Sequence, residues 1–438
     1  MIAVDVNDRA YLCFMWWKDA TMSELVLYRH KVLMFGATCS PSILGAVIAK
    51  HLSETSEEYQ EVAQQLLETL YVDNVLNSVD ELEEFENFRE KSIKLFSDAK
   101  MDLRLWQSTF DCLDDVNDDS IKTAVLGYNW NRKTDCLSLN FKKWEIPAKI
   151  TKKVVLSCVQ KVFDPMGFVA PAVLPMKLLL QKAAINKMKW EQELPAEDVS
   201  TFMKRTMEVK KLEEAQVPRL VSSGVSDRTR WSLHTFSDAS KNAYAAAVFL
   251  RVQVDGEVGV QLMMAKSRVA PIANVSIHRL ELLGCLIGAR LANTVKSALK
   301  LDDVKEYFWT DSATALAWIK RNDQWKTFVS NRTEEIVKLS NPEDWRHVPG
   351  SENPADLPSR GCTPAQLVDS KWWEGPNWLR QNVSTWPMSV EQPCEEDVIV
   401  ERSCVSMAVS DDGSFSISDR LSKSHGFEAL VASLAISE

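Results

Sequence analysis

The sequence predicts a multidomain chain of the α/β and α+β classes, whose second half forms a mixed five-stranded sheet with flanking helices. Three patterns support this prediction. Apolar and polar residues alternate over 231–238, further apolar stretches lie on both sides of Asp255-Gly256, and an amphipathic pattern runs from Arg279 to Leu299. A period of two residues indicates half-buried strands, an Asp-Gly pair favours a tight hairpin turn, and an apolar stripe of helical period indicates a helix packed on a sheet.

The predicted elements follow one another in a definite order. The first strand ends at Asp238, and residues 244–266 supply the next two, which gives three antiparallel strands in succession. The helix that follows carries Glu281 near its start. A short aromatic strand over 307–310 then leads to Asp311, and residues 312–320 are compatible with a second helix.

The last strand and the last helix are predicted between residues 345 and 360. Residues 345–348 are interpreted as a last short strand, the fifth of the sheet, followed by a loop. Asn353 is a suitable helix N-cap and Pro354 suits the first helical position, so Asp356 is expected in the first turn.

Carboxylates therefore stand at the ends of four of these elements. Magnesium prefers hard oxygen ligands, and two such ions about 4 Å apart can activate water and stabilise the leaving oxygen in phosphodiester hydrolysis. Any one of these acids alone would be interpreted as a surface residue, because the chain contains 61 Asp and Glu residues. The prediction of a metal site depends on all four together with the order of strands.

The phrases around these carboxylates resemble a known family. The order of elements resembles the type I ribonuclease H fold, and up to about Trp386 the chain resembles the polymerase and ribonuclease H portion of a BEL/Pao-type retrotransposon polyprotein. The phrases are Phe236-Ser-Asp-Ala-Ser, His278-Arg-Leu-Glu-Leu, Trp309-Thr-Asp-Ser, His347-Val-Pro-Gly-Ser-Glu-Asn-Pro-Ala-Asp and Trp372-Trp-Glu-Gly-Pro-Asn-Trp.

The resemblance implies roles for individual residues. Metal ligands for Mg²⁺ or Mn²⁺ are expected at Asp238, Glu281, Asp311 and Asp356. His347 matches the mobile-loop histidine that assists product release, and Ser312 and Asn353 are expected to contact the substrate. Pro358 departs from the family, which tends to continue a helix there, so Asp356 is expected on a single helical turn.

The first part of the chain resembles a reverse transcriptase palm. Residues 67–76 resemble its hairpin, and the four positions of its Tyr-x-Asp-Asp motif are held by Tyr71, Val72, Asp73 and Asn74. Phe35-Gly-Ala and Ser40-Pro41 resemble the segment that contacts the template, with a helix from about residue 42 to 52.

The same comparison implies that polymerase activity is lost. Asn74 replaces the second Asp of the motif and offers a neutral oxygen only. The chain starts at a point that resembles the sequence beyond the strand with the first catalytic carboxylate, and Asp5 and Asp8 lie in no matching phrase. Asp73 alone is expected to be too few acids for the metals of nucleotidyl transfer.

The charge distribution predicts a local nucleic-acid contact. The net charge of -10 and the pI of about 5.3 argue against indiscriminate binding to a nucleic-acid backbone. Residues 141–190 nevertheless contain ten lysines and only two acids, Glu145 and Asp164. This basic stripe, with Lys149, Lys152 and Lys153 as its expected phosphate contacts, fits binding along a hybrid. A solvated helix face remains the alternative.

Several classes of protein are excluded by composition. The longest apolar stretch, residues 167–176, is too short and too rich in proline to span a bilayer, and the N-terminus lacks the pattern of a signal peptide. The nine cysteines form no Cys-x-x-Cys pair, which indicates free thiols in an intracellular protein, cytoplasmic or nuclear, without a zinc site. Neither Asp-Thr-Gly nor Asp-Ser-Gly of an aspartic protease occurs, and the Gly-x-Ser-x-Gly elbow of a serine hydrolase is missing.

The expected organisation has four parts. Residues 1–110 are interpreted as a truncated palm, 111–225 as thumb and connection, 228–365 as a ribonuclease H-like domain, and 366–438 as a tryptophan-containing extension with a partly disordered tail. The function expected is two-metal cleavage of the RNA in RNA-DNA hybrids, with other polyprotein products as further partners. A catalytically inactive remnant or nucleic-acid-binding scaffold is the alternative, which the sequence does not exclude.

Overall fold

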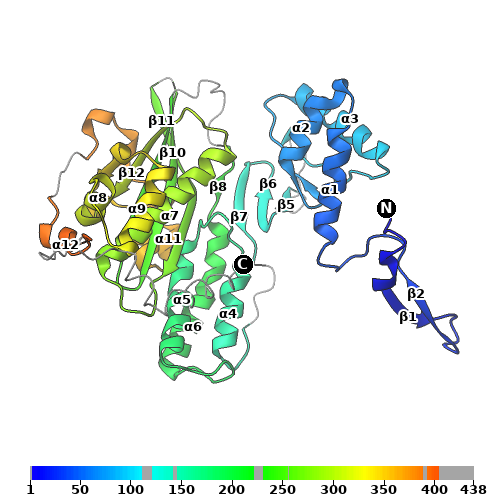
Figure 1. Cartoon of the computed structure of the whole chain (residues 1–438), viewed down its shortest axis with the longest axis horizontal. Helices are drawn as coiled ribbons and strands as arrows, with labels where there is room; N and C mark the ends of the chain where they lie inside the picture. Colours follow the sequence, from blue (N-terminus) through cyan, green and yellow to red (C-terminus); the bar gives the residue numbers. More distant parts are fainter. Residues whose placement is uncertain are drawn as a thin grey trace, which may run out of the picture. The chain divides into compact units, whose positions relative to one another are not determined.

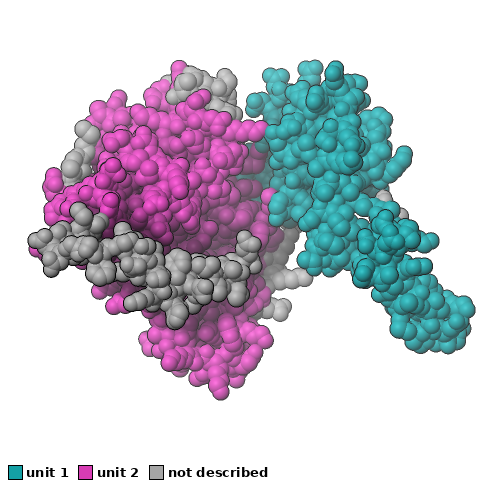
Figure 2. All heavy atoms as spheres, viewed as in Figure 1, with its two compact units in different colours: residues 1–125, 129–136 teal, residues 126–128, 137–438 magenta. Residues whose placement is uncertain are grey.

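The computed structural model describes residues 2–110, 121–141, 146–220, 230–254, 256–387 and 392–403. The chain forms two compact units, residues 1–125 with 129–136 and residues 126–128 with 137–438 (Figure 2). Parts of three predictions lie outside the described residues: the turn residue Asp255, three members of the stripe segment (Lys142, Lys143 and Glu145), and the tail beyond residue 403.

The described part of the first unit contains three α-helices around a small core. Its elements are η1 (Asp8–Tyr11), β1 (Cys13–Trp17), β2 (Leu25–Arg29), α1 (Ser40–Ser53), η2 (Glu57–Tyr59), α2 (Gln60–Thr69), β3 (Leu70–Tyr71), β4 (Asn74–Val75), α3 (Leu82–Asp98) and β5 (Lys122–Val125). The three helices bury Leu52, Leu66 and Phe88 against one another. The helix predicted from about residue 42 to 52 falls within α1.

The predicted polymerase-type hairpin is formed by β3 and β4. Leu70 pairs with Val75 and Tyr71 pairs with Asn74, which leaves Val72 and Asp73 as the turn. Val72 has a φ of 57°, which a primed two-residue turn requires at its first position and which a β-branched residue rarely adopts.

In the described part of the second unit, three α-helices precede the large sheet. The elements are α4 (Lys152–Lys161), α5 (Ala170–Ile185), α6 (Ala196–Glu208), η4 (Val209–Glu214) and β8 (Val217–Pro218), while β6 (Tyr128–Asn131) and β7 (Cys136–Leu139) lie where the chain changes unit. Val155 of α4, Met176 of α5 and Phe202 of α6 belong to the same buried cluster as Phe236 and Trp309 of the sheet. These helices therefore share a core with the sheet that follows them.

The large sheet has the predicted mixed, five-stranded form (Figure 1). Its strands are β9 (Trp231–Ala239), β10 (Ala243–Val254), β11 (Glu257–Val269), β12 (Lys305–Thr310) and β13 (Trp345–His347), in the spatial order β11-β10-β9-β12-β13. The first three are antiparallel, whereas β12 runs parallel to both β9 and β13. Gly256, with a φ of 90°, follows the end of β10 where the sequence predicts a tight turn.

Successive strand residues point to opposite faces of the sheet, and the two faces bury different clusters. Leu233 and Phe308 pack with the helices α7 (Ile277–Ala298), α8 (Ala313–Lys320) and α9 (Thr327–Leu339). Phe236 and Trp309 lie on the other face, in the cluster shared with α5 and with Trp378. The long helix predicted for residues 279–299 is thus present as α7, shifted by two residues at its start.

Short elements complete the chain. They are η6 (Pro342–Asp344), η7 (Gly350–Glu352), α10 (Asp356–Arg360), α11 (Pro364–Val368), η8 (Lys371–Trp373), η9 (Asn377–Arg380), η10 (Val383–Thr385) and α12 (Glu395–Ile399). Trp372, Trp378 and Trp386 are buried, and the ring centroids of Trp309 and Trp378 lie 4.8 Å apart, so this extension covers one face of the sheet. Within the described ranges, no helix is long and apolar enough to cross a membrane.

Candidate metal centre

Asp238 lies near the carboxyl end of the central strand β9, at the edge of the sheet that is formed by the ends of β9 and β12. It is the penultimate residue of that strand, pairs with Ala245 of β10, and is 2% exposed. The hydroxyl of Ser359, from α10, donates a hydrogen bond to its Oδ2. One carboxylate oxygen is therefore fixed by a residue 121 positions away in sequence.

Glu281 reaches the same edge from the first turns of α7. Ser276 caps this helix by accepting a hydrogen bond from the backbone N–H of Arg279. Gly284 faces the sheet so closely that an added Cβ would lie 3.0 Å from the carbonyl oxygen of Asp238. Since Glu281 lies three residues earlier on the same side of the helix, this close approach brings its carboxylate to Asp238.

Asp311 follows directly after β12. Because β12 runs parallel to β9, with Thr310 opposite Ser237, both strands end at the same edge and their next residues are neighbours. The backbone carbonyl of Asp311 lies 3.1 Å from Nε2 of His347, the last residue of β13. Gly350 passes close by, since a Cβ there would lie 3.0 Å from Oδ2 of Asp311.

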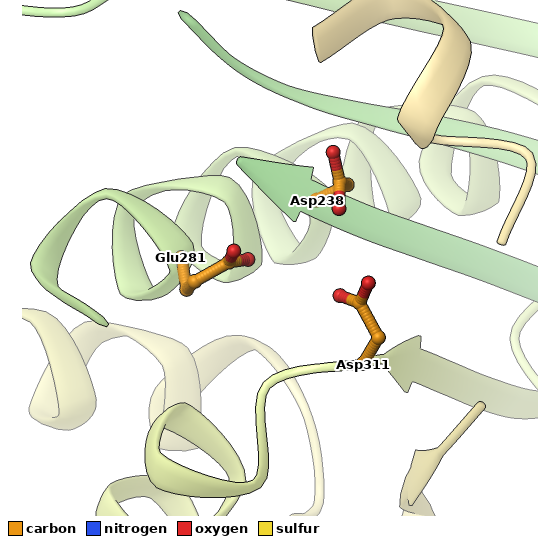
Figure 3. Close-up of side chains that lie close together, drawn as sticks. All are labelled: Asp238, Glu281 and Asp311. Carbon is orange, nitrogen blue, oxygen red and sulfur yellow. The ribbon is translucent and has the colours of Figure 1, made fainter. Parts of the chain in front are cut away.

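The three carboxylates point toward one another (Figure 3). Each of Asp238, Glu281 and Asp311 offers a ligand oxygen within 4.8 Å of the others. Oε2 of Glu281 and Oδ1 of Asp311 are buried and have no hydrogen-bond partner among the described residues. Buried, unpartnered carboxylate oxygens are costly unless a cation binds them, so this donor set fits a divalent metal ion.

The electrostatics of the triad agree with its crowding. Burial, together with the charges of Asp238 and Asp311, raises the pKa of Glu281 to about 10. Burial and the charge of Asp311 raise the pKa of Asp238 to about 7, and burial also raises the pKa of Asp311. Three negative charges on the triad are therefore unfavourable, and a bound cation would stabilise the ionised carboxylates.

Asp356 does not belong to the group of carboxylates whose oxygens lie within 4.8 Å of one another. It is the first residue of α10 and forms an ion pair with Arg360, four residues later. Its charge raises the pKa values of Asp238 and Asp311, so it lies within electrostatic reach of both. The single-turn helix expected from Pro358 is present, but its predicted start was wrong: the N-cap is Ala355, so Asn353 and Pro354 precede the helix.

Other residues predicted to contact substrate have structural partners. Oδ1 of Asn353 accepts a bond from the N–H of Ala355, and its Nδ2 donates to the carbonyl of Ser237 at 2.9 Å. The hydroxyl of Ser312 caps α8 by accepting from the N–H of Ala315. His347 ends β13, within the strand predicted over 345–348, and is 6% exposed; its predicted role in product release stays a prediction.

Three lysines of the basic stripe already have partners. Nζ of Lys153 lies 3.2 Å from Glu191, and Lys152 stacks over Trp190 at 4.6 Å from the ring centroid. Lys182 pairs with Asp198 at 2.6 Å, and partial burial lowers the pKa of Lys177. Both acidic partners, Glu191 and Asp198, lie after residue 190, outside the segment 141–190 from which the basic stripe was predicted. Lys149 is exposed.

The hairpin of β3 and β4 carries no comparable acidic site. Tyr71 is exposed, and the side-chain amide of Asn74 donates to Oδ1 of Asp73 at 3.1 Å. Among the residues that the structure describes, three metal-ligand groups come together only at Asp238, Glu281 and Asp311.

Two residues that shape the site were missed from the sequence. The role of Gly284 was predictable in principle, because two glycines four residues apart on an amphipathic helix, Gly284 and Gly288, indicate close packing on a neighbouring element. No pattern in the sequence indicated the role of Ser359, since its partner Asp238 is distant in sequence.

Comparisons with solved structures find similar chains at low sequence identity. The foamy viral protease-reverse transcriptase in complex with dsDNA is 13% identical, with a TM-score of 0.44, and the match covers 79% of this chain and 64% of that one. The N-terminal RNase H domain of Rv2228c from Mycobacterium tuberculosis, solved as a fusion with maltose-binding protein, is 12% identical with a TM-score of 0.21, over 28% of this chain and 85% of that one. LC11-RNase H1 in complex with an RNA/DNA hybrid is 13% identical with a TM-score of 0.21, over 29% of this chain and 91% of that one.

No curated protein matches the chain. Residues 151–312 match a family model described as the Pao retrotransposon-like RNaseH-like domain. The matched segment begins before α4 and contains the whole acidic triad, whereas His347 and Asp356 lie beyond it. The match confirms the predicted resemblance to Pao-type retrotransposons over residues 151–312.

Proposed function

We propose that this chain is a retroelement-derived ribonuclease H that cleaves the RNA strand of RNA-DNA hybrids with Mg²⁺ or Mn²⁺. The observation that carries the proposal is the convergence of Asp238, Glu281 and Asp311 at one edge of the sheet, with two buried oxygens that lack a hydrogen-bond partner among the described residues. Hard carboxylate oxygens in this number suit Mg²⁺, which keeps part of its water shell for reaction.

The chain's residues have separate tasks in this proposal. Asp238, Glu281 and Asp311 would hold the metal ions, and Asp356 would join them after leaving Arg360. The bound ions would supply an activated water and stabilise the leaving oxygen of the phosphodiester. Ser359 orients Asp238, while the bond between His347 and the carbonyl of Asp311 fixes the backbone that carries this carboxylate.

The remaining parts of the chain are proposed to be inherited from the polymerase. Residues 1–110 would derive from the palm and 111–225 from the thumb and connection, ahead of the nuclease domain of 228–365 and the extension of 366–438. Asn74 gives the hairpin a single carboxylate, Asp73, so we propose that DNA synthesis is lost.

A non-catalytic scaffold is a second candidate, favoured by one observation. Asp356 is engaged by Arg360, so three rather than four of the predicted carboxylates converge. A scaffold of this kind would bind a hybrid and leave its RNA strand intact.

A cleavage assay on an end-labelled RNA-DNA hybrid tests the proposal. The wild-type chain is expected to cut the RNA with Mg²⁺ or Mn²⁺ and to be inactive with EDTA. Asp311→Asn is expected to abolish cleavage, on the order of 10³-fold or more, because it removes a shared ligand of the reacting ions. Asp302→Asn is the matched control, since Asp302 is exposed shortly before β12 and should leave cleavage unchanged. Equal cleavage by both variants would contradict the site, and intact RNA with the wild type would favour the scaffold.

A further inference from the structure

A hollow of about 510 Å³ opens beside the acidic triad. It lies between the end of β9, the turn into β10, the start of α7 and the end of α10, and is lined by Ala239, Ser240, Lys241, Asn242, Ile277 and Arg360. Ala239 directly follows Asp238, and Ile277 lies one helical turn before Glu281. Two of the lining side chains are cationic and none is acidic, so the hollow favours an anionic ligand.

Arg360 lines this hollow and also contacts Asp356, the fourth predicted metal ligand. Its Nε pairs with Oδ1 of Asp356, and the two side chains are 66% and 41% exposed. The hydrogen bond that Arg360 donates to Asp356 raises the pKa of Arg360, and the charges of Asp356, Asp238 and Asp311 add to this effect. The guanidinium therefore lies within electrostatic reach of the triad while it occupies the fourth predicted ligand.

The pair between Asp356 and Arg360 can be exchanged at low cost. Exposed ion pairs contribute little to stability, because water solvates both partners when they separate. A divalent cation at the triad would attract the carboxylate of Asp356 more strongly than a single guanidinium does. Once released, the guanidinium is free to bind a phosphate through two parallel hydrogen bonds.

Lys241 is the second cationic side chain of the hollow and can bind the same phosphate group. It lies in the turn between β9 and β10, is exposed, and forms no ion pair with any residue that the structure describes. The turn itself is braced, because the hydroxyl of Ser240 donates to the carbonyl of Ser359 and accepts from the N–H of Ala243. The cation of Lys241 is thus carried on a fixed backbone at the mouth of the hollow.

We propose that Arg360 and Lys241 form a phosphate-binding subsite for the backbone of the nucleic-acid substrate, and that Asp356 blocks Arg360 until a divalent cation draws the carboxylate away. This inference rests on the proposed function, since the cation and the hybrid are the ligands which that function implies. Arg360 acts here as a binding and positioning residue.

Equilibrium binding of a fluorescently labelled RNA-DNA hybrid, followed by anisotropy over a series of salt concentrations, tests the subsite. The titrations are run with EDTA and with Ca²⁺, an oxygen-loving ion of looser geometry that substitutes for Mg²⁺ in binding. With Ca²⁺, Arg360→Gln and Lys241→Gln are each expected to weaken binding about tenfold and to reduce the slope of log K against log salt by about 0.9. Arg360→Lys is expected to restore most of the slope, because it restores the charge.

The blocking role of Asp356 gives a distinct signature without divalent ions. With EDTA, Arg360→Gln is expected to bind the hybrid as the wild type does, whereas Asp356→Asn is expected to bind it several-fold more tightly. The gain should disappear in the double variant Asp356→Asn with Arg360→Gln, because the two residues act as a pair. Arg290→Gln is the matched control: Arg290 is also paired to a carboxylate, that of Glu335 at 2.6 Å, but on the outer side of α7.

Each result decides the inference. A salt slope for Arg360→Gln with Ca²⁺ that equals the slope for Arg290→Gln would overturn it, as would an Asp356→Asn gain that survives in the double variant. Thermal unfolding of each variant checks that the fold is retained. Failure of the proposed function would look different, because the wild type would then leave the hybrid uncut with Mg²⁺ while the binding slopes still report on Arg360.

Discussion

Gly284 of α7 and Asp238 of β9 touch through their backbones. A Cβ on Gly284 would lie 3.0 Å from the carbonyl oxygen of Asp238 and 3.3 Å from that of Ala245, both of which are backbone atoms that cannot move aside. Both distances are tighter than most real Cβ contacts, so any side chain at position 284 would require the helix or the strand to shift. Because Glu281 extends from the same face of α7, this contact sets the distance between two of the three clustered carboxylates.

Gly284→Ala is expected to push α7 away from the sheet. The overpacking should cost about 1–3 kcal/mol of unfolding free energy, and a shift of Glu281 by about 1 Å should lower cleavage on the order of 10²-fold. Gly45→Ala in α1 is the control, because nothing lies within 4 Å of its added Cβ. That change should stabilise the chain by about 0.5–1 kcal/mol. Denaturant unfolding and the hybrid assay measure both variants, and an unaffected Gly284→Ala enzyme would contradict the role of the close contact.

The triad predicts that Mg²⁺ stabilises the fold more strongly at high pH than at low pH. Burial raises the pKa of Asp238 to about 7 and that of Glu281 to about 10, both well above those of unfolded carboxyls at about 4. The folded state then binds more protons than the unfolded state above about pH 4, so the metal-free protein loses stability as the pH rises through this window. Mg²⁺ reverses the loss by binding the ionised form.

Thermal unfolding with Mg²⁺ and with EDTA at pH 5.5 and 8 measures this effect. The rise in melting temperature caused by Mg²⁺ is expected to be clearly larger at pH 8. In Asp311→Asn the rise should be small at both values, because one ligand and one buried charge are gone. A rise of equal size at the two pH values in the wild type would show that the ion does not bind the triad.

The elements that position the triad could be predicted because their signals are local. Alternation over 231–238 and the stripe of α7 each lie within one segment, and they locate Asp238 and Glu281 at element ends. Parallel pairing of β12 with β9 then brings Asp311 to the same edge. The pairing of Asp356 with Arg360 was also visible in principle, since four residues make one helical turn.

What the sequence did not predict depends on partners that only the tertiary structure brings together. The burial of His347 follows from its place in the edge strand β13, next to β12. The stripe was inferred from a count over 141–190, but Glu191 and Asp198 neutralise members of it from outside that segment. A count of charges along the chain has no means of finding such pairs.

His347→Ala is expected to slow turnover about tenfold while cleavage remains measurable. The histidine touches the backbone carbonyl of Asp311 and is not one of the clustered ligands, so its loss should loosen that carboxylate without removing it. Steady-state and single-turnover rates on the labelled hybrid separate slow product release from slow chemistry. Loss of cleavage as complete as in Asp311→Asn would instead place His347 among the catalytic residues.

Asn74→Asp is expected not to restore DNA synthesis. Nucleotidyl transfer uses metal ions shared among several carboxylates, and a restored acid at position 74 would join only Asp73 at the tip of the hairpin. In the part of the chain that the structure describes, no third metal ligand accompanies these two positions. Primer extension on an RNA template, with Mg²⁺ or Mn²⁺, measures the effect. Asn77→Asp adds the same charge to the exposed segment just beyond β4 and serves as the control. Template-dependent extension by Asn74→Asp, but not by Asn77→Asp, would show that another acid of this chain completes the polymerase site.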